Sequence, residues 1–594
     1  MKLTWSIHLV GVYCALALTG CGGGSDSGSN IVPPAPVPPT QLQDVSLDLS
    51  VQTDLVKRVY GSDSTGRFGV PVAAGLDVDG DGLEDFAMSG MQAAPFGRVG
   101  AGQVWLFFGD GTVGGEISTT DVNQQWIVFA GAGNNESTGG EIWIDDVTGD
   151  GLGDLIIGRH TYSHTMPDRI GAGALTIISG DAALKTSIGQ TFDLGAMPSS
   201  LNVFTLIGAQ SMDRLGFWMR TGDVTGDNVA DVIFGSDQSD LSGNNSGVAF
   251  VLQGGSHLQT NATVDLSNTT GSAVDRLILR IDPPQLSTDY HFGATVALAD
   301  LDQNGQQDLL ISAALSRVGG LLLPENASAT QGIRNGGNVG GSVFIVWDDN
   351  LPPADAWPSN LVLSVDSLPG SMTRIDGAAT GSRFVNERFG EDLIGGADYD
   401  GDGFTDLYVG DIRGDSVDIG VDSGVGHVFF AAESLKGRNF SLTNPPADVV
   451  MSVILGESPG AISADTSIQG DLDGDGLVDL VVASPLADPS GRVDAGTIHV
   501  LWGQQGPWPQ EIELSRSRRT SHPDFEITDI FGRFGRQSDA DQGDTLMYSA
   551  AIGDLNNDGL ADMVVNEMRG NGSSDNTLDV GNLIVISGAA VPRR

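Results

Sequence analysis

Cysteine is nearly absent from this chain of 594 residues, which has only Cys14 and Cys21. The sequence after residue 21 therefore cannot be stapled by disulfides. Basic residues are also scarce, because 29 lysines and arginines stand against 76 aspartates and glutamates, and the net charge is −47. A surface this negative repels phosphate groups, which argues against DNA or RNA as a partner.

Long helical patterns and common catalytic motifs are missing as well. No long stretch has the amphipathic period of a helix, and the short apolar runs are rich in valine, isoleucine and phenylalanine, which favours strands. The sequence contains no Gly-x-Ser-x-Gly elbow and no phosphate-binding loop. His160 and His164 are four residues apart, but they lie in a predicted loop, where a plain surface role is favoured over a zinc site. His291, His427 and His499 are expected to be structural.

What the chain has in abundance is a nine-residue aspartate pattern. Residues 77–85 read DVDGDGLED, and related segments begin at residues 146, 223, 300, 398, 471 and 554. Every copy has Asp at positions 1 and 9 and Asp or Asn at position 5. Calcium binds about six to eight oxygens, which carboxylates at alternate positions of a tight loop and the backbone carbonyl of position 7 can supply. The seven copies predict up to seven Ca²⁺ sites.

The predicted ligands occupy positions 1, 3, 5, 7 and 9 of each copy. They are Asp77, Asp79, Asp81, Leu83 and Asp85; Asp146, Thr148, Asp150, Leu152 and Asp154; Asp223, Thr225, Asp227, Val229 and Asp231; Asp300, Asp302, Asn304, Gln306 and Asp308; Asp398, Asp400, Asp402, Phe404 and Asp406; Asp471, Asp473, Asp475, Leu477 and Asp479; and Asp554, Asn556, Asp558, Leu560 and Asp562. The loops of the first, fifth and sixth copies have four aspartates each and are expected to bind most tightly.

The strands repeat together with the loops. Each aspartate loop is followed by a short apolar run, a polar stretch, a second apolar run introduced by glycine, and one more candidate strand. Seven such units of about four strands predict an all-β fold, a seven-bladed β-propeller with a calcium-binding loop between strands 1 and 2 of each blade. Residues 53–61 occupy the place of the outer strand of the last unit, so they are predicted to close the ring.

These units resemble the FG-GAP repeats of the integrin α-subunit β-propeller. The pairs that carry the resemblance are Phe68-Gly69, Phe292-Gly293 and Phe389-Gly390, with Leu215-Gly216 as a near match. The second and sixth units depart from the motif, with Gly139-Gly140 and Ala464-Asp465 in its place. The resemblance implies bound calcium and a recognition face opposite the aspartate loops, but a propeller scaffold carries many functions.

The start of the chain resembles a bacterial lipoprotein precursor. Residues 1–20 are apolar after Lys2 and are predicted to be a signal peptide, and residues 18–21 read LTGC, like a lipobox, which implies lipidation of Cys21. The alternative is an ordinary secretory signal with a chance cysteine. Residues 21–44 are expected to be a tether rich in Gly, Ser and Pro, and residues 45–594 the propeller. The expected location is the bacterial cell envelope, as an outer-membrane lipoprotein anchored without spanning the membrane.

Two classes of function remain open. We favour a non-enzymatic module that presents loops to a protein or glycan partner, because no separate catalytic domain is left once the blades are counted. The alternative is a polysaccharide-active enzyme, a lyase or hydrolase, since paired carboxylates cleave glycosides. Acids or histidines that converge on one mouth of the channel would favour the enzyme. An apolar or aromatic face would favour the non-enzymatic binding module. The long connection 313–340, with Leu321, Leu322 and Leu323, is a candidate contact surface or a local cap of the channel.

Overall fold

The computed structural model describes residues 45–593 except 52, 63–66, 122–124, 166–167, 269–275, 285–288, 315–339, 354–356, 359–360, 369–371, 379–381, 520–523, 537–542 and 574–578. The chain divides into two units, Met1–Gln43 and Asp44–Arg594. The predicted signal peptide, Cys21 and most of the leucine-rich connection lie outside the described residues. Within the described part, no helix is long and apolar enough to cross a membrane.

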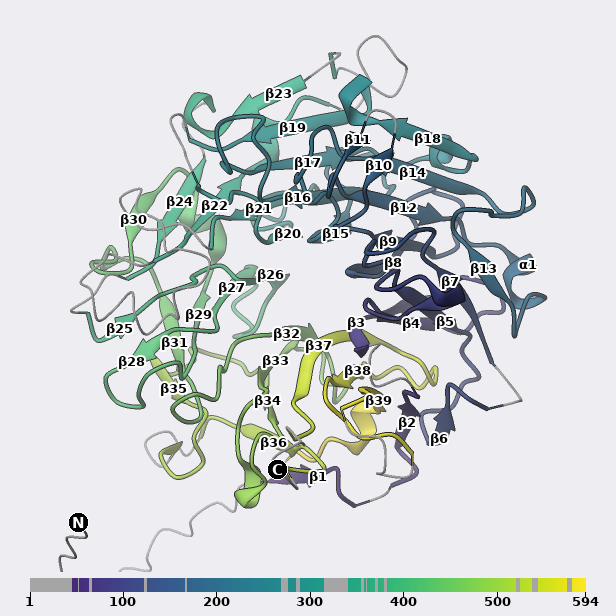
Figure 1. Cartoon of the computed structure of the whole chain (residues 1–594). Helices are drawn as coiled ribbons and strands as arrows, with labels where there is room; N and C mark the ends of the chain where they lie inside the picture. The colour runs from purple at the N-terminus through teal and green to yellow at the C-terminus, as the bar shows by residue number, and fades with distance from the viewer. Residues whose placement is uncertain are drawn as a thin grey trace, which may run out of the picture. The chain divides into compact units, whose positions relative to one another are not determined.

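The second unit is a ring of seven five-stranded sheets around a central axis (Figure 1). From the axis outward, blade 1 contains β3 (Phe68–Leu76), β4 (Asp85–Gly90), β5 (Gln103–Phe107), β7 (Trp126–Ala130) and β13 (Thr191–Asp193). Blade 2 contains β8 (Glu141–Asp145), β9 (Asp154–Gly158), β12 (Ala174–Ile178), β14 (Val203–Ile207) and β18 (Ala262–Asp265). Blade 3 contains β15 (Met219–Gly222), β16 (Asp231–Ser236), β17 (Val248–Leu252), β19 (Ile278–Asp282) and β23 (Leu361–Ser364).

The remaining four blades follow the same plan. Blade 4 contains β20 (Val296–Ala299), β21 (Asp308–Ser312), β22 (Ser342–Val346), β24 (Thr373–Asp376) and β30 (Asn439–Ser441). Blade 5 contains β26 (Asp392–Ala397), β27 (Asp406–Asp411), β29 (Val425–Phe429), β31 (Met451–Leu455) and β35 (Glu511–Glu513). Blade 6 contains β32 (Ser467–Gly470), β33 (Asp479–Ser484), β34 (Thr497–Leu501), β36 (Ile527–Phe531) and β1 (Ser46–Asp48). Blade 7 contains β37 (Leu546–Gly553), β38 (Asp562–Glu567), β39 (Asn582–Ile586), β2 (Val56–Tyr60) and β6 (Gly115–Ser118).

The seven-bladed, all-β prediction is confirmed, but each blade has five strands where about four were predicted. The first four are antiparallel neighbours, and the fifth runs parallel to the fourth. The next blade along the chain supplies it: β13 pairs with β7 of blade 1 but lies in sequence between β12 and β14 of blade 2. This short strand covers the outer edge of each sheet, where unpaired backbone groups would otherwise be exposed.

The N-terminal strands close the ring. Strand β2 pairs antiparallel with β39, from Val56 opposite Ile586 to Tyr60 opposite Asn582, which confirms the prediction for residues 53–61. Strand β1 then adds to the outer edge of blade 6, parallel to β36. Both chain-terminal regions of this unit are thereby held in sheets, and no blade is left with three strands.

The hydrophobic core lies between neighbouring blades. The strands at the middle of each sheet are buried on both faces, which explains why their sequences are continuous apolar runs. The Phe-Gly pairs contribute to this core: Phe68 packs edge-on against Trp105, with ring centroids 4.8 Å apart. Gly69 has φ +82°, and a Cβ atom there would lie 2.9 Å from the carbonyl oxygen of Asn582, so a side chain is excluded.

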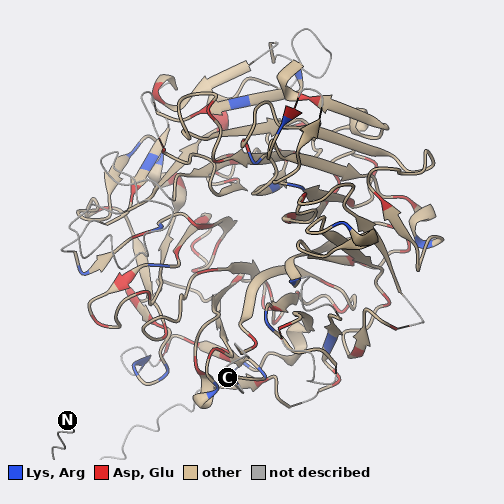
Figure 2. Cartoon of the chain, viewed as in Figure 1, with Lys and Arg blue, Asp and Glu red and all other residues tan. Residues whose placement is uncertain are grey.

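Outside the seven sheets, the described residues include two small ribbons and one short α-helix. The ribbons pair β10 (His164–Thr165) with β11 (Asp168–Arg169) and β25 (Phe384–Val385) with β28 (Asp415–Ser416). Helix α1 (Ala182–Lys185) has a single turn. Acidic residues are distributed around the whole ring and outnumber basic ones (Figure 2).

Candidate metal centres and the channel mouth

Every aspartate loop connects the first and second strands of its blade, as predicted. Neighbouring loops are hydrogen-bonded through their backbones: Gly153 N donates to Asp77 O at 2.8 Å, Gln307 N to Asp223 O at 3.1 Å and Ala561 N to Asp471 O at 3.1 Å. The loops therefore lie side by side on one face of the ring. The connections between strands 2 and 3, and the links from one blade to the next, lie on the opposite face because the strands are antiparallel.

The carboxylate at position 1 organises each loop. In the first loop, Asp77 accepts hydrogen bonds from the backbone N–H groups of Gly80 and Gly82, each at 2.6 Å. Gly82 has φ +90°, the left-handed conformation that this tight turn requires. Asn228 occupies the same position in the third loop with φ 64°, so asparagine accommodates the turn.

The aspartate at position 9 is buried in all seven loops, and it connects its loop to the end of the third strand by hydrogen bonds. Asp85 accepts hydrogen bonds from Val78 N within its own loop and from Gly109 N after the third strand, both at 2.8 Å. The other position-9 residues are Asp154, Asp231, Asp308, Asp406, Asp479 and Asp562, and they make the equivalent pair of contacts. Burial raises the pKa of Asp85 to about 7. The sequence predicted only a ligand role for these residues.

Four loops bring three carboxylates close enough to hold one metal ion. The groups found among the described residues, each with oxygens within 4.8 Å of one another, are Asp77, Asp79 and Asp85; Asp302, Asp308 and Asp348; Asp398, Asp400 and Asp406; and Asp471, Asp473 and Asp479. Among the described residues, the enclosed Oδ1 of Asp302 accepts no hydrogen bond, and Oδ2 of Asp79 has only an ion pair with Lys185. Carboxylate oxygens are hard ligands, and those that accept no hydrogen bond are available to bind Ca²⁺. The second, third and seventh loops have Thr148, Thr225 and Asn556 at position 3, so they offer fewer charges.

Three of these loops also meet a basic side chain from the following blade. Lys185 Nζ lies 3.2 Å from Asp79 Oδ2 and contacts Asp81. Lys436 Nζ lies 2.8 Å from Asp302 Oδ2 and 3.1 Å from Asp349 Oδ2. Arg593 contacts Asp473 and Asp475. We call Lys185, Lys436 and Arg593 the basic arms; a bound metal ion would share carboxylate oxygens with them.

The central channel is narrow and mostly apolar. A cavity of about 310 Å³ on the axis is lined by the first strands of all seven blades, including Ala73, Leu298, Ile394 and Ile552. Arg220 is the basic residue in this lining, and its guanidinium lies 4.5 Å from the ring centre of Trp143. The channel therefore offers a small apolar space with one guanidinium, which is paired with Glu141 at 2.9 Å.

Acidic residues converge on the channel mouth opposite the aspartate loops. Glu141 and Asp392 begin the innermost strands of blades 2 and 5, and Asp465 precedes that of blade 6. Burial raises the pKa of Glu141 and of Asp392 to about 7. Burial, with Glu391 and Asp392 nearby, raises the pKa of Asp465 well above its usual value. Arg220 donates to Glu141 at 2.9 Å and Arg388 to Glu391 at 2.8 Å, so acids outnumber bases.

Comparison with known families identifies the repeat. The FG-GAP repeat family matches residues 68–107 and 469–501, which cover the inner three strands of blade 1 and most of those of blade 6. The chain contains FG-GAP repeats. The matched segments include the first and sixth aspartate loops, 77–85 and 471–479. No curated protein matches the chain.

Solved structures similar to this FG-GAP propeller include two rhamnogalacturonan lyases. The exotype lyase YesX shares 13% identity, covering 90% of this chain and 76% of the lyase, with a TM-score of 0.33. The lyase YesW shares 10% identity, covering 88% of this chain and 72% of the lyase, with a TM-score of 0.30. Likeness this low carries no argument about activity.

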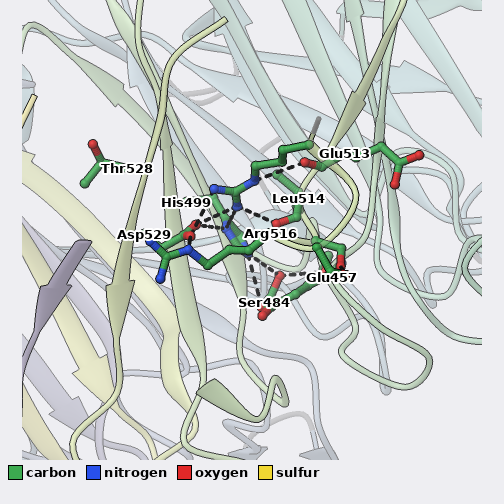
Figure 3. Close-up of polar contacts among 12 residues, drawn as sticks. Glu457, Ser484, His499, Glu513, Leu514, Arg516, Thr528 and Asp529 are labelled. Atoms are coloured by element: carbon green, nitrogen blue, oxygen red, sulfur yellow. Dashed lines mark hydrogen bonds and ion pairs between the residues drawn. The ribbon is translucent and has the colours of Figure 1, made fainter. Parts of the chain in front are cut away.

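Blade 6 of the FG-GAP propeller contains a polar network with the order of a nucleophilic triad (Figure 3). Ser484 Oγ lies 3.0 Å from His499 Nε2, and His499 Nδ1 lies 2.7 Å from Asp529 Oδ1. All three residues are 0% exposed, and Arg519 pairs with Asp529 at 2.6 Å. Substrate cannot reach this serine, so the network is structural, as predicted for His499.

His160 and His164 are also structural in their surroundings. Burial lowers the pKa of His160 to about 4, and its ring packs edge-on against Phe217 at 4.8 Å. The sequence suggested a surface loop for this residue, and the structure places it inside. His164 lies in β10, with Nε2 4.0 Å from Asp265, and neither histidine belongs to a metal-holding group among the described residues.

Proposed function

We propose that this protein is a calcium-stabilised FG-GAP propeller, lipid-anchored in the bacterial cell envelope, which binds a protein or glycan partner through the face opposite its aspartate loops. The aspartate loops connect neighbouring blades and bind the ion. The partner therefore contacts the opposite face, where the connections vary most in length and structure.

Exposed apolar side chains carry this proposal. Seven of the large apolar residues that are exposed in the described part of the chain lie in connections on the opposite face: Phe96, Val99, Ile170, Met212, Val417, Val421 and Val493. Phe404 is the one such residue within an aspartate loop of the described chain. Exposed apolar groups gathered on one face are typical of interaction surfaces.

The face opposite the aspartate loops also contains additional structure in its connections. Both small ribbons belong to it, because β10–β11 lies between the second and third strands of blade 2, and β28 lies between those of blade 5. Met212 N donates to Ile170 O at 2.9 Å, so exposed groups of blades 2 and 3 are adjacent. A partner could therefore contact several blades at once.

The test is a binding screen with matched variants. A chain beginning at residue 45 is used for pull-down from envelope extract and for a glycan array, each in calcium and in chelator. The triple variant Phe96→Ser, Ile170→Ser and Met212→Ser is expected to lose most of the partner binding that the natural chain shows. Phe404→Ser on the loop face serves as the control. Equal binding by all three proteins would contradict the proposed face.

A second candidate function, polysaccharide cleavage, is favoured by one observation. Asp392, Asp465 and Glu391 converge on one mouth of the channel, and their raised pKa values suit a general acid. The assay is release of reducing ends or unsaturated products from a panel of polysaccharides. Activity abolished by Asp465→Asn, with partner binding intact, would establish the enzyme.

A further inference from the structure

Blade 5 contains a buried carboxylate that accepts no hydrogen bond from the described residues. Glu387 lies in the link that leads into β26 and is 3% exposed. Both of its carboxylate oxygens are enclosed, and neither has a hydrogen-bond partner among the described residues. Enclosing an ionised carboxylate without compensation is costly, and burial raises the pKa of Glu387 to about 8, so an added positive charge is what would keep this group ionised at neutral pH.

The charges around Glu387 are mostly of the same sign. Asp415, Asp411 and Asp422 are the carboxylates that act on it most strongly, and Arg413 is the opposing charge. Arg413 Nη1 lies 3.4 Å from Asp422 Oδ1, while its Nε has no hydrogen-bond partner in the described part of the chain. Arg388 also acts on Asp411, but it is already paired with Glu391 at 2.8 Å, so positive charge remains short beside these four carboxylates.

Two of these acids are held in place by the backbone. Asp411 accepts hydrogen bonds from Glu387 N at 2.8 Å and Arg388 N at 3.0 Å, so it already has a structural role. Asp415 lies opposite Val385 in the β25–β28 ribbon and accepts a hydrogen bond from Asp422 N at 2.8 Å. The ribbon thereby presents Asp415 and Asp422 beside the link that contains Glu387.

Blade 2 shows how the same position is compensated elsewhere in the chain. Gly139 N donates to Gly158 O and Gly390 N donates to Gly410 O, both at 3.0 Å, which aligns the two blades. Glu136 is then the counterpart of Glu387, and it accepts hydrogen bonds from Arg159 Nη2 at 2.7 Å and Ala132 N at 2.9 Å. The counterpart of Arg159 in blade 5 is Asp411. Blade 5 has an acid where blade 2 has the neutralising base.

We propose that Glu387, Asp415 and Asp422 bind a divalent metal cation, of which calcium fits best, on the face opposite the aspartate loops. Both oxygens of Glu387 are available for bidentate binding, and calcium accepts irregular sets of carboxylates completed by water, whereas magnesium demands octahedral geometry. A small ion can reach an enclosed carboxylate, whereas the side chain of a protein partner is too large to reach it. Unlike the four loop groups, these carboxylates do not all lie within 4.8 Å of one another, and binding therefore requires them to move closer together.

Two measurements test this site on the chain beginning at residue 45. Crystals soaked in Tb³⁺ should give an anomalous peak between Glu387, Asp415 and Asp422. Calcium counted at equilibrium should fall by one ion per chain in Glu387→Gln. The control Glu136→Gln, which removes the matching carboxylate of blade 2, should leave the count unchanged.

Either measurement can overturn the proposal. Peaks at the aspartate loops without one at Glu387, or an unchanged count in Glu387→Gln, would show that no ion binds there. Circular dichroism of both variants checks folding, and the Tb³⁺ soak needs no variant. This site is independent of the aspartate loops, so a peak at Glu387 with empty loops would contradict the proposed calcium stabilisation and leave this site standing.

Discussion

Removing the buried aspartate at position 9 should destabilise the propeller even when no metal is present. The third loop is the best place to test this, because Thr225 at position 3 leaves it with few charged ligands. Asp231 is 0% exposed and accepts hydrogen bonds from Val224 N at 2.9 Å, Thr225 N at 3.0 Å and Gly254 N at 2.8 Å. These three contacts connect the loop to the end of the third strand of its blade.

The magnitude follows from the groups left behind. Asp231→Ala leaves three buried backbone N–H groups without acceptors, at about 1–3 kcal/mol each, so the expected loss is about 3–9 kcal/mol in the free energy of unfolding. Asp231→Asn keeps one carboxamide oxygen as an acceptor but places an amide donor opposite a backbone N–H, so a loss of about 1–3 kcal/mol in the free energy of unfolding is expected. The control is Asp227→Ala at exposed position 5, where Asp227 accepts from Val229 N at 3.0 Å and about 0.5–1.5 kcal/mol is expected.

The assay is urea unfolding in chelator at pH 8, followed by tryptophan fluorescence and circular dichroism. The pH keeps Asp231 ionised, because burial raises its pKa only to about 6. If Asp231→Ala is no less stable than Asp227→Ala under these conditions, position 9 acts only through a metal ion, and the structural role argued here is wrong.

Three further predictions concern pH, the basic arms and the anchor. Burial raises the pKa of the position-9 aspartates, for example of Asp154 and Asp479 to about 7, so the folded state retains protons that the unfolded state releases above about pH 4. The melting temperature in chelator should therefore fall between pH 5 and pH 8, and calcium should reduce the fall; a melting temperature that rises over this range would contradict the assignment. Lys185→Gln should tighten calcium binding at the first loop, because Lys185 shares the oxygens of Asp79 and Asp81 with the ion, and calorimetric titration against the control Lys57→Gln, whose partner is Asp110, measures this. Cys21→Ser should release the protein from the membrane fraction and abolish labelling by a fatty-acid analogue, and labelling that persists would refute lipidation.

The fold was predictable because its unit repeats. Seven copies of one loop, each flanked by apolar runs, determine the number of blades, and β2 could be assigned because it fills a gap in that repeat. The fifth strands were missed because strands such as β13, Thr191–Asp193, are too short to show any period. Their pairing depends on the neighbouring blade and is not encoded in a local pattern.

The candidate sites were predictable only where one segment supplies every residue. The aspartate loops meet that condition, whereas the partner of Asp85, Gly109 N, is 24 residues away, and Lys185 is 104 residues from Asp81. Asp348 joins the fourth loop through the end of the third strand, which no loop pattern predicts. The acids of the channel mouth come from different blades, so only the closed ring brings them together.

Calcium dependence of the melting temperature is the most direct test of the account. A chain beginning at residue 45 is melted in calcium and in chelator at pH 8. A site that binds only the folded state adds about 2.7 kcal/mol when calcium exceeds its Kd a hundredfold, so several occupied loops should raise the melting temperature by many degrees. Superimposable melting curves would show that the aspartate loops do not bind calcium and would contradict the account.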